Sequence, residues 1–386
     1  MKFFLSIVCL LAFPTGFVAI STCAAQDDPI LSFQGEQAVI PMPATAGRHL
    51  VQVRIGNAGP YAFLIDTGST ISAIDTQLAK SLGLKIVGEI LVGAPGGEQV
   101  AANRVSMLPV TAGDLLIEHA EMVAIDLVEM TNGLMEGILG MDLFRELVLT
   151  YDPQNERAVV SREHLRADDP SVVKIDSSGG GVNAAISVAG RKVMAHFDSG
   201  SPGGVTLPLD MMDGLPLASG PSKAGKARLV GGERSLLERK LEGAVKIGTL
   251  EYVNPTLTFM DPSAPFANIG SKVLDELLIV IDQRSRLLSI KEAEPRQQAD
   301  QAAPVPRRLG VRFRGSPGGG LSEIAGVDPG SPGEQAGFEV GDRVVSLNER
   351  SISEYDQQSL GQLIRGPSDL TWVVERAGER LTIVVR

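Results

Sequence analysis

Cysteine is almost absent from this 386-residue chain, whose only two are Cys9 and Cys23. Both lie near the N-terminus, so the rest of the chain has no disulfide framework and no cysteine nucleophile. Aromatic residues make up only 4% of the chain, and 35 lysines and arginines are outnumbered by 46 aspartates and glutamates. The formal net charge of -11 argues against nucleic acid as a partner, because phosphate binding needs clustered basic residues.

Glycine and small turn-forming residues are plentiful. The chain has 43 glycines, 23 prolines and 44% hydrophobic residues, a mixture typical of a turn-rich, mainly β protein of two or three domains. Alternating apolar and polar residues predict a strand over Val39–Val53, and the periodicity of Thr76–Leu84 predicts a short helix.

The N-terminus has the pattern of a targeting segment. A basic residue precedes an apolar run over 3–20, and small residues follow over 21–25. This pattern predicts a signal peptide at residues 1–25, and hence an exported protein, periplasmic or secreted. A retained anchor, or a membrane-attached lipoprotein modified at Cys23, stays open, and we expect membrane attachment only in these two cases.

The most informative feature is an internal repeat. An apolar strand pattern runs into Asp-Thr-Gly-Ser at 66–69, and a second runs into Asp-Ser-Gly-Ser at 198–201. The first copy is followed by Ile-Leu-Gly at 138–140 and the second, at a similar distance, by Asn-Ile-Gly at 268–270. The repeat predicts two related lobes.

A strand that ends in Asp-Thr/Ser-Gly can project a carboxylate from a tight turn. Glycine lets neighbouring backbone approach closely, and the hydroxyl can fix the loop by hydrogen bonding. Two such carboxylates placed face to face share a proton, so that one acts as a general base and the other as a general acid. A water between them can then attack a peptide carbonyl without a metal or a covalent intermediate.

The two motifs resemble those of the pepsin/retropepsin superfamily of aspartic proteases. The resemblance implies a mainly β, two-lobed fold, with lobes at 38–165 and 170–292, that hydrolyses protein or peptide substrates and needs no cofactor or metal. Asp66 and Asp198 would be the catalytic pair. The residues implied to support the pair are Thr67, Gly68, Ser69, Ser199, Gly200 and Ser201.

The family covers its substrate with a mobile β-hairpin flap between these motifs, and a similar segment occurs in the second lobe. The implied flap residues are Val92, Gly93, Ala94, Gly96 and Gly97 in the first lobe and Gly231 and Gly232 in the second. Neither segment has the tyrosine that is usual in pepsin-like enzymes. Asn268 also replaces an expected apolar residue, from which we expect a looser second lobe.

Two alternatives stay open. The first is a protease-like scaffold that binds extended peptides without cutting them. The second is a trypsin-like serine hydrolase, because the sequence around Ser199 also resembles the nucleophile loop of that class. The chain has only 4 histidines, and His196 is too close in sequence to act as a trypsin-type base.

The C-terminal segment is expected to form a separate domain. A polar, proline-containing linker is predicted at 293–307. Residues 308–386 resemble a PDZ domain, a small β-sandwich with helices, through the motifs Val-Asp-Pro-Gly-Ser-Pro and Ala-Gly-Phe. The resemblance implies that a peptide C-terminus binds there, with its carboxylate held by the loop Leu309, Gly310 and Val311, beside a helix over about 354–364.

Overall fold

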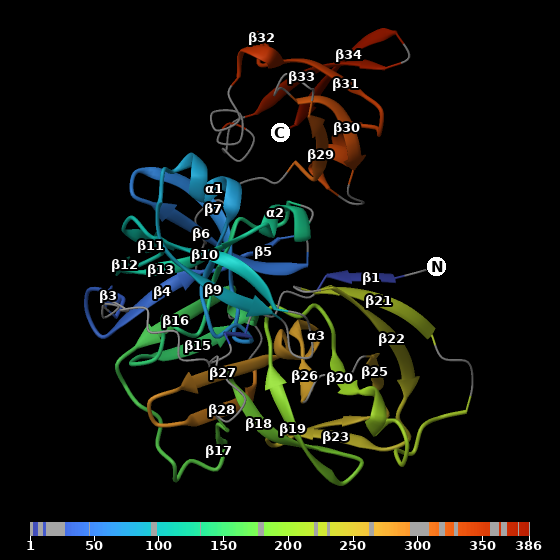
Figure 1. Ribbon diagram of the computed structural model, residues 1–386. Helices are drawn as coiled ribbons and strands as arrows, with labels where there is room; N and C mark the ends of the chain where they lie inside the picture. The colour runs from blue at the N-terminus through green and yellow to red at the C-terminus, as the bar shows by residue number, and fades with distance from the viewer. Residues whose placement is uncertain are drawn as a thin grey trace. The chain divides into compact units, whose positions relative to one another are not determined.

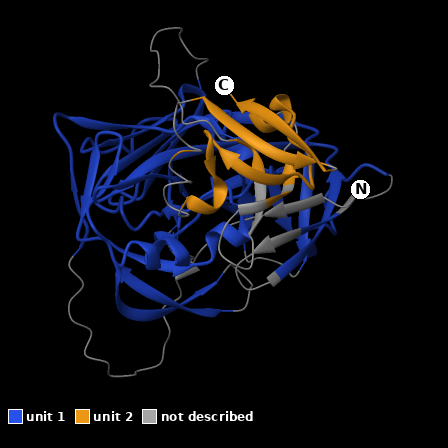
Figure 2. Cartoon of the chain, turned by 90° about the horizontal axis from the view of Figure 1, so that it is seen from above, with its two compact units in different colours: residues 1–298 blue, residues 299–386 orange. Residues whose placement is uncertain are grey.

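The computed structural model divides the chain into two compact units, residues 1–298 and 299–386, which are coloured separately in Figure 2. The structure describes all residues except 1–2, 7–10, 13–27, 46, 94–98, 132, 177–180, 220–222, 230–231, 262–265, 294–308, 316–320, 328–330, 356–362, 364–368, 377 and 386. Nearly all of the predicted linker and most of the predicted signal peptide therefore lie outside the described residues. Within the described part, no helix has the length and apolar character needed to cross a membrane.

The first unit contains one large sheet for each lobe (Figure 1). From edge to edge, the first-lobe strands are β2 (Leu11–Ala12), β9 (Lys85–Gly93), β10 (Val100–Ser106), β13 (Glu121–Ile125), β8 (Ala73–Asp75), β14 (Gly137–Leu139), β7 (Ala58–Ile65), β6 (Arg48–Ile55), β11 (Val110–Ala112), β12 (Leu115–Glu118) and β3 (Ile30–Ser32), with β5 (Ala44–Thr45) paired to β6. The second-lobe strands are β1 (Phe3–Ser6), β21 (Lys223–Leu229), β22 (Gly232–Lys240), β25 (Thr256–Asp261), β20 (Val205–Pro208), β26 (Ala267–Ile269), β19 (Arg191–Phe197), β18 (Asn183–Val188), β23 (Ala244–Ile247) and β24 (Leu250–Val253).

A third sheet joins the two lobes. Its strands, in order, are β17 (Val172–Lys174), β28 (Leu287–Glu292), β27 (Leu277–Asp282), β15 (Val148–Asp152), β16 (Arg157–Ser161) and β4 (Gln37–Pro41). The central pair, β15 and β27, comes from different lobes and is antiparallel. One hydrophobic core runs through this sheet and both lobes, and includes Phe144, Tyr151 and Phe197. The lobes therefore share a core, which fixes the geometry between them.

Helices are few and short. The described helices are α1 (Thr76–Ser81), α2 (Leu127–Met130), α3 (Ser271–Leu274) and α4 (Pro332–Ala336), with 3-10 turns η1 (Pro153–Asn155), η2 (Leu209–Met211) and η3 (Ile352–Glu354). The helix expected over Thr76–Leu84 begins where predicted, because the Asp75 carboxylate accepts hydrogen bonds from the N–H groups of its first turn, and ends at Ser81.

The prediction of one continuous strand over Val39–Val53 is wrong. The segment forms β4, β5 and β6, which are separated near Pro43 and Gly47. Proline has no N–H for a strand ladder, and Gly47 has a φ of 73°, a left-handed conformation that ends a strand. As a result β4 joins the shared sheet and β6 joins the first-lobe sheet.

The strand order from β9 to β12 in the first lobe sheet matches the order from β21 to β24 in the second, as the internal repeat predicts. In the first, β14 lies between β7 and β8 and runs parallel to β7, with Leu139 opposite Ile65. In the second, β26 lies between β19 and β20 and runs parallel to β19, with Ile269 opposite Phe197. The predicted mainly β, two-lobed fold class is confirmed.

The second unit is a small sheet domain. Its strands are β29 (Val311–Gly315), β30 (Leu321–Val327), β31 (Arg343–Leu347), β33 (Leu370–Arg376) and β34 (Glu379–Val385), with β32 (Arg350–Ser351) paired to β31. Trp372 is fully buried and meets the Phe338 ring edge-on, at 5.8 Å between ring centroids. Most of the helix expected over 354–364 lies outside the described residues.

Candidate active site

Each aspartate of the repeat follows the end of a buried strand. Asp66 follows β7, and its N–H donates to the carbonyl of Leu139 on β14 at 3.0 Å. Asp198 follows β19, and its N–H donates to the carbonyl of Ile269 on β26 at 2.9 Å. Both side chains are completely buried. The neighbouring strand thus fixes the backbone of each aspartate.

The two Asp loops pack directly on each other. A side chain at Gly68 would collide with the carboxyl group of Asp198, so only glycine permits this approach. The N–H of Gly68 donates to Asp66 Oδ1 at 2.9 Å, and the N–H of Ser201 donates to Asp198 Oδ1 at 3.0 Å. Each carboxyl group is therefore oriented by its own loop.

Hydroxyl groups join the loops across the lobe boundary. The N–H of Thr67 donates to Ser199 Oγ at 3.0 Å, and the N–H of Ser199 donates to Thr67 Oγ1 at 3.1 Å. Each hydroxyl then donates to the opposite strand, Thr67 to the Phe197 carbonyl at 2.8 Å and Ser199 to the Ile65 carbonyl at 2.7 Å. The loops thus lie in a symmetric, fully hydrogen-bonded arrangement.

This arrangement leaves Ser199 poorly suited to act as a nucleophile. Its hydroxyl is buried and makes two hydrogen bonds to the backbone of the first lobe. The nearby His196 ring faces other groups, with Nδ1 at 2.8 Å from Asn183 Oδ1 and Nε2 at 2.9 Å from the Gly68 carbonyl. The Ser199 hydroxyl therefore links the two Asp loops.

Arg48 is a site residue that sequence reasoning missed. It begins β6, is only 7% exposed, and donates through Nη2 to the carbonyls of Ser199 and Gly200, each at 2.8 Å. A buried guanidinium from the first lobe thereby holds the Asp loop of the second. An arginine within an alternating strand carries no signal in the sequence that would distinguish it from an exposed one.

The surroundings of the pair favour a shared proton. Burial and the negative charge of Asp198 raise the pKa of Asp66 well above its usual range, although the Gly68 N–H and the charge of Arg48 oppose this shift. Two buried carboxyl groups in contact cannot both ionise cheaply. One of the two carboxyl groups should therefore keep a proton.

A second group of titratable side chains, the buried Tyr151 and the half-buried Asp275, lies near Arg48. The Tyr151 hydroxyl donates to Asp275 Oδ1 at 3.4 Å, and burial raises the pKa of both groups. The nearby charges of His49 and Arg48 act in the opposite direction on Asp275. Arg48 is therefore electrostatically linked both to this group and to Asp66.

Asn268 is the second site residue that sequence reasoning missed. Its amide Nδ2 donates to Asp198 Oδ2 at 2.7 Å. We expected this residue to loosen the second lobe, but it lies in β26, paired with β19 and β20, and supports the aspartate directly. In the sequence, the only sign of this role is that a polar residue stands where the repeat has an apolar one. The role itself becomes clear only when the position of Asp198 in the fold is known.

A hairpin is present in each lobe where a flap is expected. Strands β9 and β10 pair in the first lobe, and β21 and β22 pair in the second. Val92 and Gly93 end β9 and are buried, and Gly232 begins β22. The other expected flap residues, Ala94, Gly96, Gly97 and Gly231, lie outside the described residues.

The described residues contain no group of three or more His, Cys, Asp and Glu side chains arranged to hold a metal ion. The chemistry that the arrangement can perform with its own residues is acid–base catalysis by two carboxyl groups.

In the second unit, the expected carboxylate loop leads into an edge strand. Gly310 has a φ of 65°, and Val311 begins β29, which ends the described sheet. Leu309 is buried, and its carbonyl accepts from the Gly333 N–H at 2.8 Å. The loop is thus tied to α4 through its backbone.

Comparison with known families agrees with this description. Residues 51–143 match the family model of an aspartyl protease, and residues 323–376 match that of a PDZ domain. The first match contains Asp66 and the Ile-Leu-Gly motif at 138–140. No curated protein matches the chain. The resemblance to a protease followed by a PDZ domain is confirmed.

Proposed function

We propose that this chain is an aspartic endopeptidase that hydrolyses peptide bonds with a water activated by Asp66 and Asp198. The observation that carries the proposal is the symmetric contact of two Asp loops from two matching lobes. Their carboxyl groups are buried together, and Thr67 and Ser199 hold the loops in register. The match of the first lobe to the aspartyl protease family supports it.

In this mechanism the two carboxyl groups have different tasks. The Asp198 carboxylate takes a proton from the water as the water oxygen attacks the peptide carbonyl carbon, while Asp66 gives its proton to the carbonyl oxygen. The tetrahedral intermediate then collapses as the C–N bond breaks: the proton on Asp198 passes to the leaving amine, and one hydroxyl group of the intermediate returns a proton to Asp66 as the carbonyl re-forms. Asp66 Oδ2 is buried and has no hydrogen-bond partner among the described residues, so in this mechanism the bound water or the substrate carbonyl would be its partner.

The test compares cleavage of a denatured protein mixture by the unmodified chain and by Asp66→Asn, Asp198→Asn and Ser199→Ala across pH. We expect both Asn variants to lose cleavage and Ser199→Ala to retain it. Asp168→Asn, at an exposed aspartate, is the matched control and should behave like the unmodified chain. Absence of cleavage by the unmodified chain at every pH would instead favour a peptide-binding scaffold.

We propose that the second unit binds protein C-termini at β29. A strand at the edge of a sheet can accept a peptide as a further strand, and the preceding loop can hold the terminal carboxylate. The test is binding of labelled peptides with a free or an amidated C-terminus, of which only the first should bind. Gly310→Val should weaken binding, because its side chain would collide with Ser331.

The N-terminal pattern leads us to propose export with removal of residues 1–25. N-terminal sequencing of the mature protein should then begin at Gln26. Recovery of Met1 or a lipid-modified Cys23 would contradict this.

A further inference from the structure

Next to the first Asp loop, three side chains that lie side by side on neighbouring strands are apolar. Leu64, two residues before Asp66, pairs with Leu50 on β6 and with Ile138 on β14. All three side chains are at most 1% exposed and belong to one hydrophobic cluster. Asp66 is therefore adjacent to a row of side chains that offers no hydrogen bond.

The second lobe has polar side chains at the same three places. His196, two residues before Asp198, pairs with Asn183 on β18 and with Asn268 on β26. We name Asn183, His196 and Asn268 the polar row. Its first two members are at most 6% exposed. Burial of polar groups costs free energy unless they are hydrogen-bonded. The hydrogen bonds of the polar row therefore indicate which groups it supports.

The polar row contacts both Asp loops. His196 lies between Asn183 Oδ1, at 2.8 Å, and the carbonyl of Gly68 in the opposite loop, at 2.9 Å. Asn268 donates its amide to Asp198 Oδ2 at 2.7 Å. Among the described residues, Asn268 Oδ1 is buried without a hydrogen-bond partner, so the contact with Asp198 is what the Asn268 side chain supplies.

We propose that Asn268 is a positioning residue that gives the aspartate pair a fixed polarity, holding Asp198 as the carboxylate and leaving the shared proton on Asp66. An amide N–H binds an ionised carboxylate more strongly than a neutral carboxyl group. Ile138 at the corresponding place in the first lobe supplies no such donor to Asp66. At this position the two lobes therefore differ, because only the second provides a side-chain donor to its aspartate. The consequence for catalysis rests on the proposed protease function.

Burial and the charge of Asp198 raise the pKa of Asp66, in agreement with a proton on that side of the pair. Among the described residues, the other titratable groups around the pair include Arg48 on β6, Tyr151 on β15, His196 on β19 and Asp275 after α3, with His49 beside Asp275. All of these are kept in the variants below, so a difference between variants reports on Asn268.

Two variants change the contact in different ways. Asn268→Ile gives the second lobe the side chain that the first lobe has at Ile138, and Asn268→Asp keeps the shape but replaces the donor by a carboxyl group. The matched control is Asn155→Leu, which removes another asparagine that donates to a carboxylate, at 3.0 Å to each oxygen of Asp152. This contact lies outside the aspartate pair.

The first measurement is the free energy of unfolding of the full chain from pH 3 to pH 8. The destabilisation by Asn268→Ile should be largest near neutral pH, where the lost donor served an ionised Asp198, and should diminish towards acid pH. A loss of packing alone would be independent of pH. Destabilisation of the same size at every pH would overturn the proposal, whether or not the protein cleaves peptides.

The second measurement is the pH profile of kcat/KM. Loss of the donor makes ionisation of the pair harder, so Asn268→Ile should move the acidic limb to higher pH by about one unit, a roughly tenfold loss at the foot of the limb. Asn268→Asp should move it further, and Asn155→Leu should not move it. An acidic limb unchanged in Asn268→Ile would overturn the proposal.

The two measurements separate this inference from the proposed function. If no cleavage depends on Asp66 and Asp198 but the stability difference still varies with pH, the protease function fails and the polarity of the pair stands. If cleavage depends on both aspartates but neither profile responds to Asn268→Ile, the protease function stands and the inference fails.

Discussion

Thr67 and Ser199 exchange hydrogen bonds, each backbone N–H donating to the hydroxyl of the other at 3.0–3.1 Å. Because these residues come from different lobes and lie directly after the two aspartates, the exchange couples the position of one carboxyl group to that of the other. Each hydroxyl also donates to the strand that carries the opposite aspartate, at Phe197 and Ile65. The register of the pair therefore depends on four hydrogen bonds, two accepted and two donated by the hydroxyl groups of two small side chains.

Removal of either hydroxyl should lower both stability and activity without abolishing the chemistry. Ser199→Ala leaves the Thr67 N–H and the Ile65 carbonyl unpartnered in the interior, and each unpartnered group costs about 1–3 kcal/mol. Thr67→Ala should have a similar effect through the symmetric contacts. Chemical denaturation measures the loss, and cleavage assays measure the residual activity.

Ser187→Ala, on β18 outside the loops, is the control for this pair and should leave both quantities unchanged. Reaction of the unmodified chain with a serine-directed phosphonate, or complete loss of cleavage in Ser199→Ala without unfolding, would support the serine hydrolase instead.

Arg48→Met should shift the pH dependence of cleavage as well as destabilise the fold. The variant removes the donor to the carbonyls of Ser199 and Gly200, at a cost of about 1–3 kcal/mol. It also removes a positive charge that lowers the pKa of Asp66, so this pKa should rise further and the basic limb of kcat/KM, where Asp66 loses the proton that it donates, should move to higher pH.

Arg48→Lys keeps the charge and should restore most of the pH profile, although its single ammonium group lacks the planar fork of arginine. Arg54→Met, at an exposed position of the same strand, is the matched control. An unchanged basic limb in Arg48→Met would show that its charge does not act on Asp66.

Asp66→Asn should stabilise the protein near neutral pH while it abolishes cleavage. Burial and Asp198 raise the pKa of Asp66 in the folded protein, so its contribution to stability is fully present below the unfolded pKa of about 3.9 and is lost as pH rises through the folded pKa. Asparagine is neutral throughout and avoids this loss. The melting temperature of the variant should exceed that of the unmodified chain at neutral pH, by about 2–4 °C per kcal/mol, and converge with it in acid. A less stable variant at neutral pH would contradict the assignment of the proton.

The sequence indicates the two Asp loops because the repeat preserves the residues whose local geometry is required, such as Gly68 between packed loops. It also indicates the PDZ domain, whose motifs match a family model. Arg48 and Asn268 could not be assigned from the sequence, because their roles depend on partners 151 and 70 positions away along the chain. The division of Val39–Val53 into three strands was missed because alternation alone does not show which sheet a segment joins.

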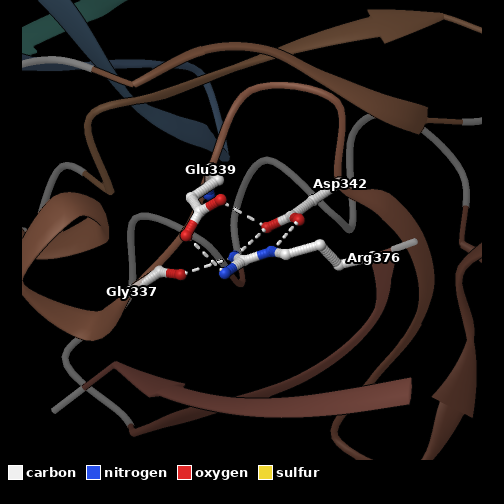
Figure 3. A network of polar contacts seen from close by, with 4 residues as sticks. All are labelled: Gly337, Glu339, Asp342 and Arg376. Carbon is white, nitrogen blue, oxygen red and sulfur yellow. Dashed lines mark hydrogen bonds and ion pairs between the residues drawn. The ribbon is translucent and has the colours of Figure 1, made fainter. Parts of the chain in front are cut away.

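In the second unit, Arg376 should contribute strongly to the stability of the sheet domain. Figure 3 shows its guanidinium between two acidic side chains and a backbone carbonyl. It contacts both carboxylate oxygens of Asp342, at 2.6 and 2.8 Å, Glu339 at 2.6 Å and the Gly337 carbonyl at 2.7 Å. Because Asp342 is buried, Arg376→Leu would leave an unpaired carboxylate and should cost about 2–3 kcal/mol, as the partly exposed arginine reduces the effect.

The destabilisation should also depend on pH. Burial acts to raise the pKa of Asp342, but the hydrogen bonds from Arg376 and the Glu339 N–H outweigh it, so the pKa lies below its usual value. This contribution is present above the unfolded pKa of about 3.9 and is lost as pH falls through the folded pKa, so the variant and the unmodified chain should converge in acid. Hydrogen exchange of β31 and β33 in the full chain measures the difference. Arg343→Leu, which breaks one exposed contact with Glu375 at 3.2 Å, should cost less than about 1 kcal/mol, and equal effects of the two variants would show that burial of Asp342 adds nothing.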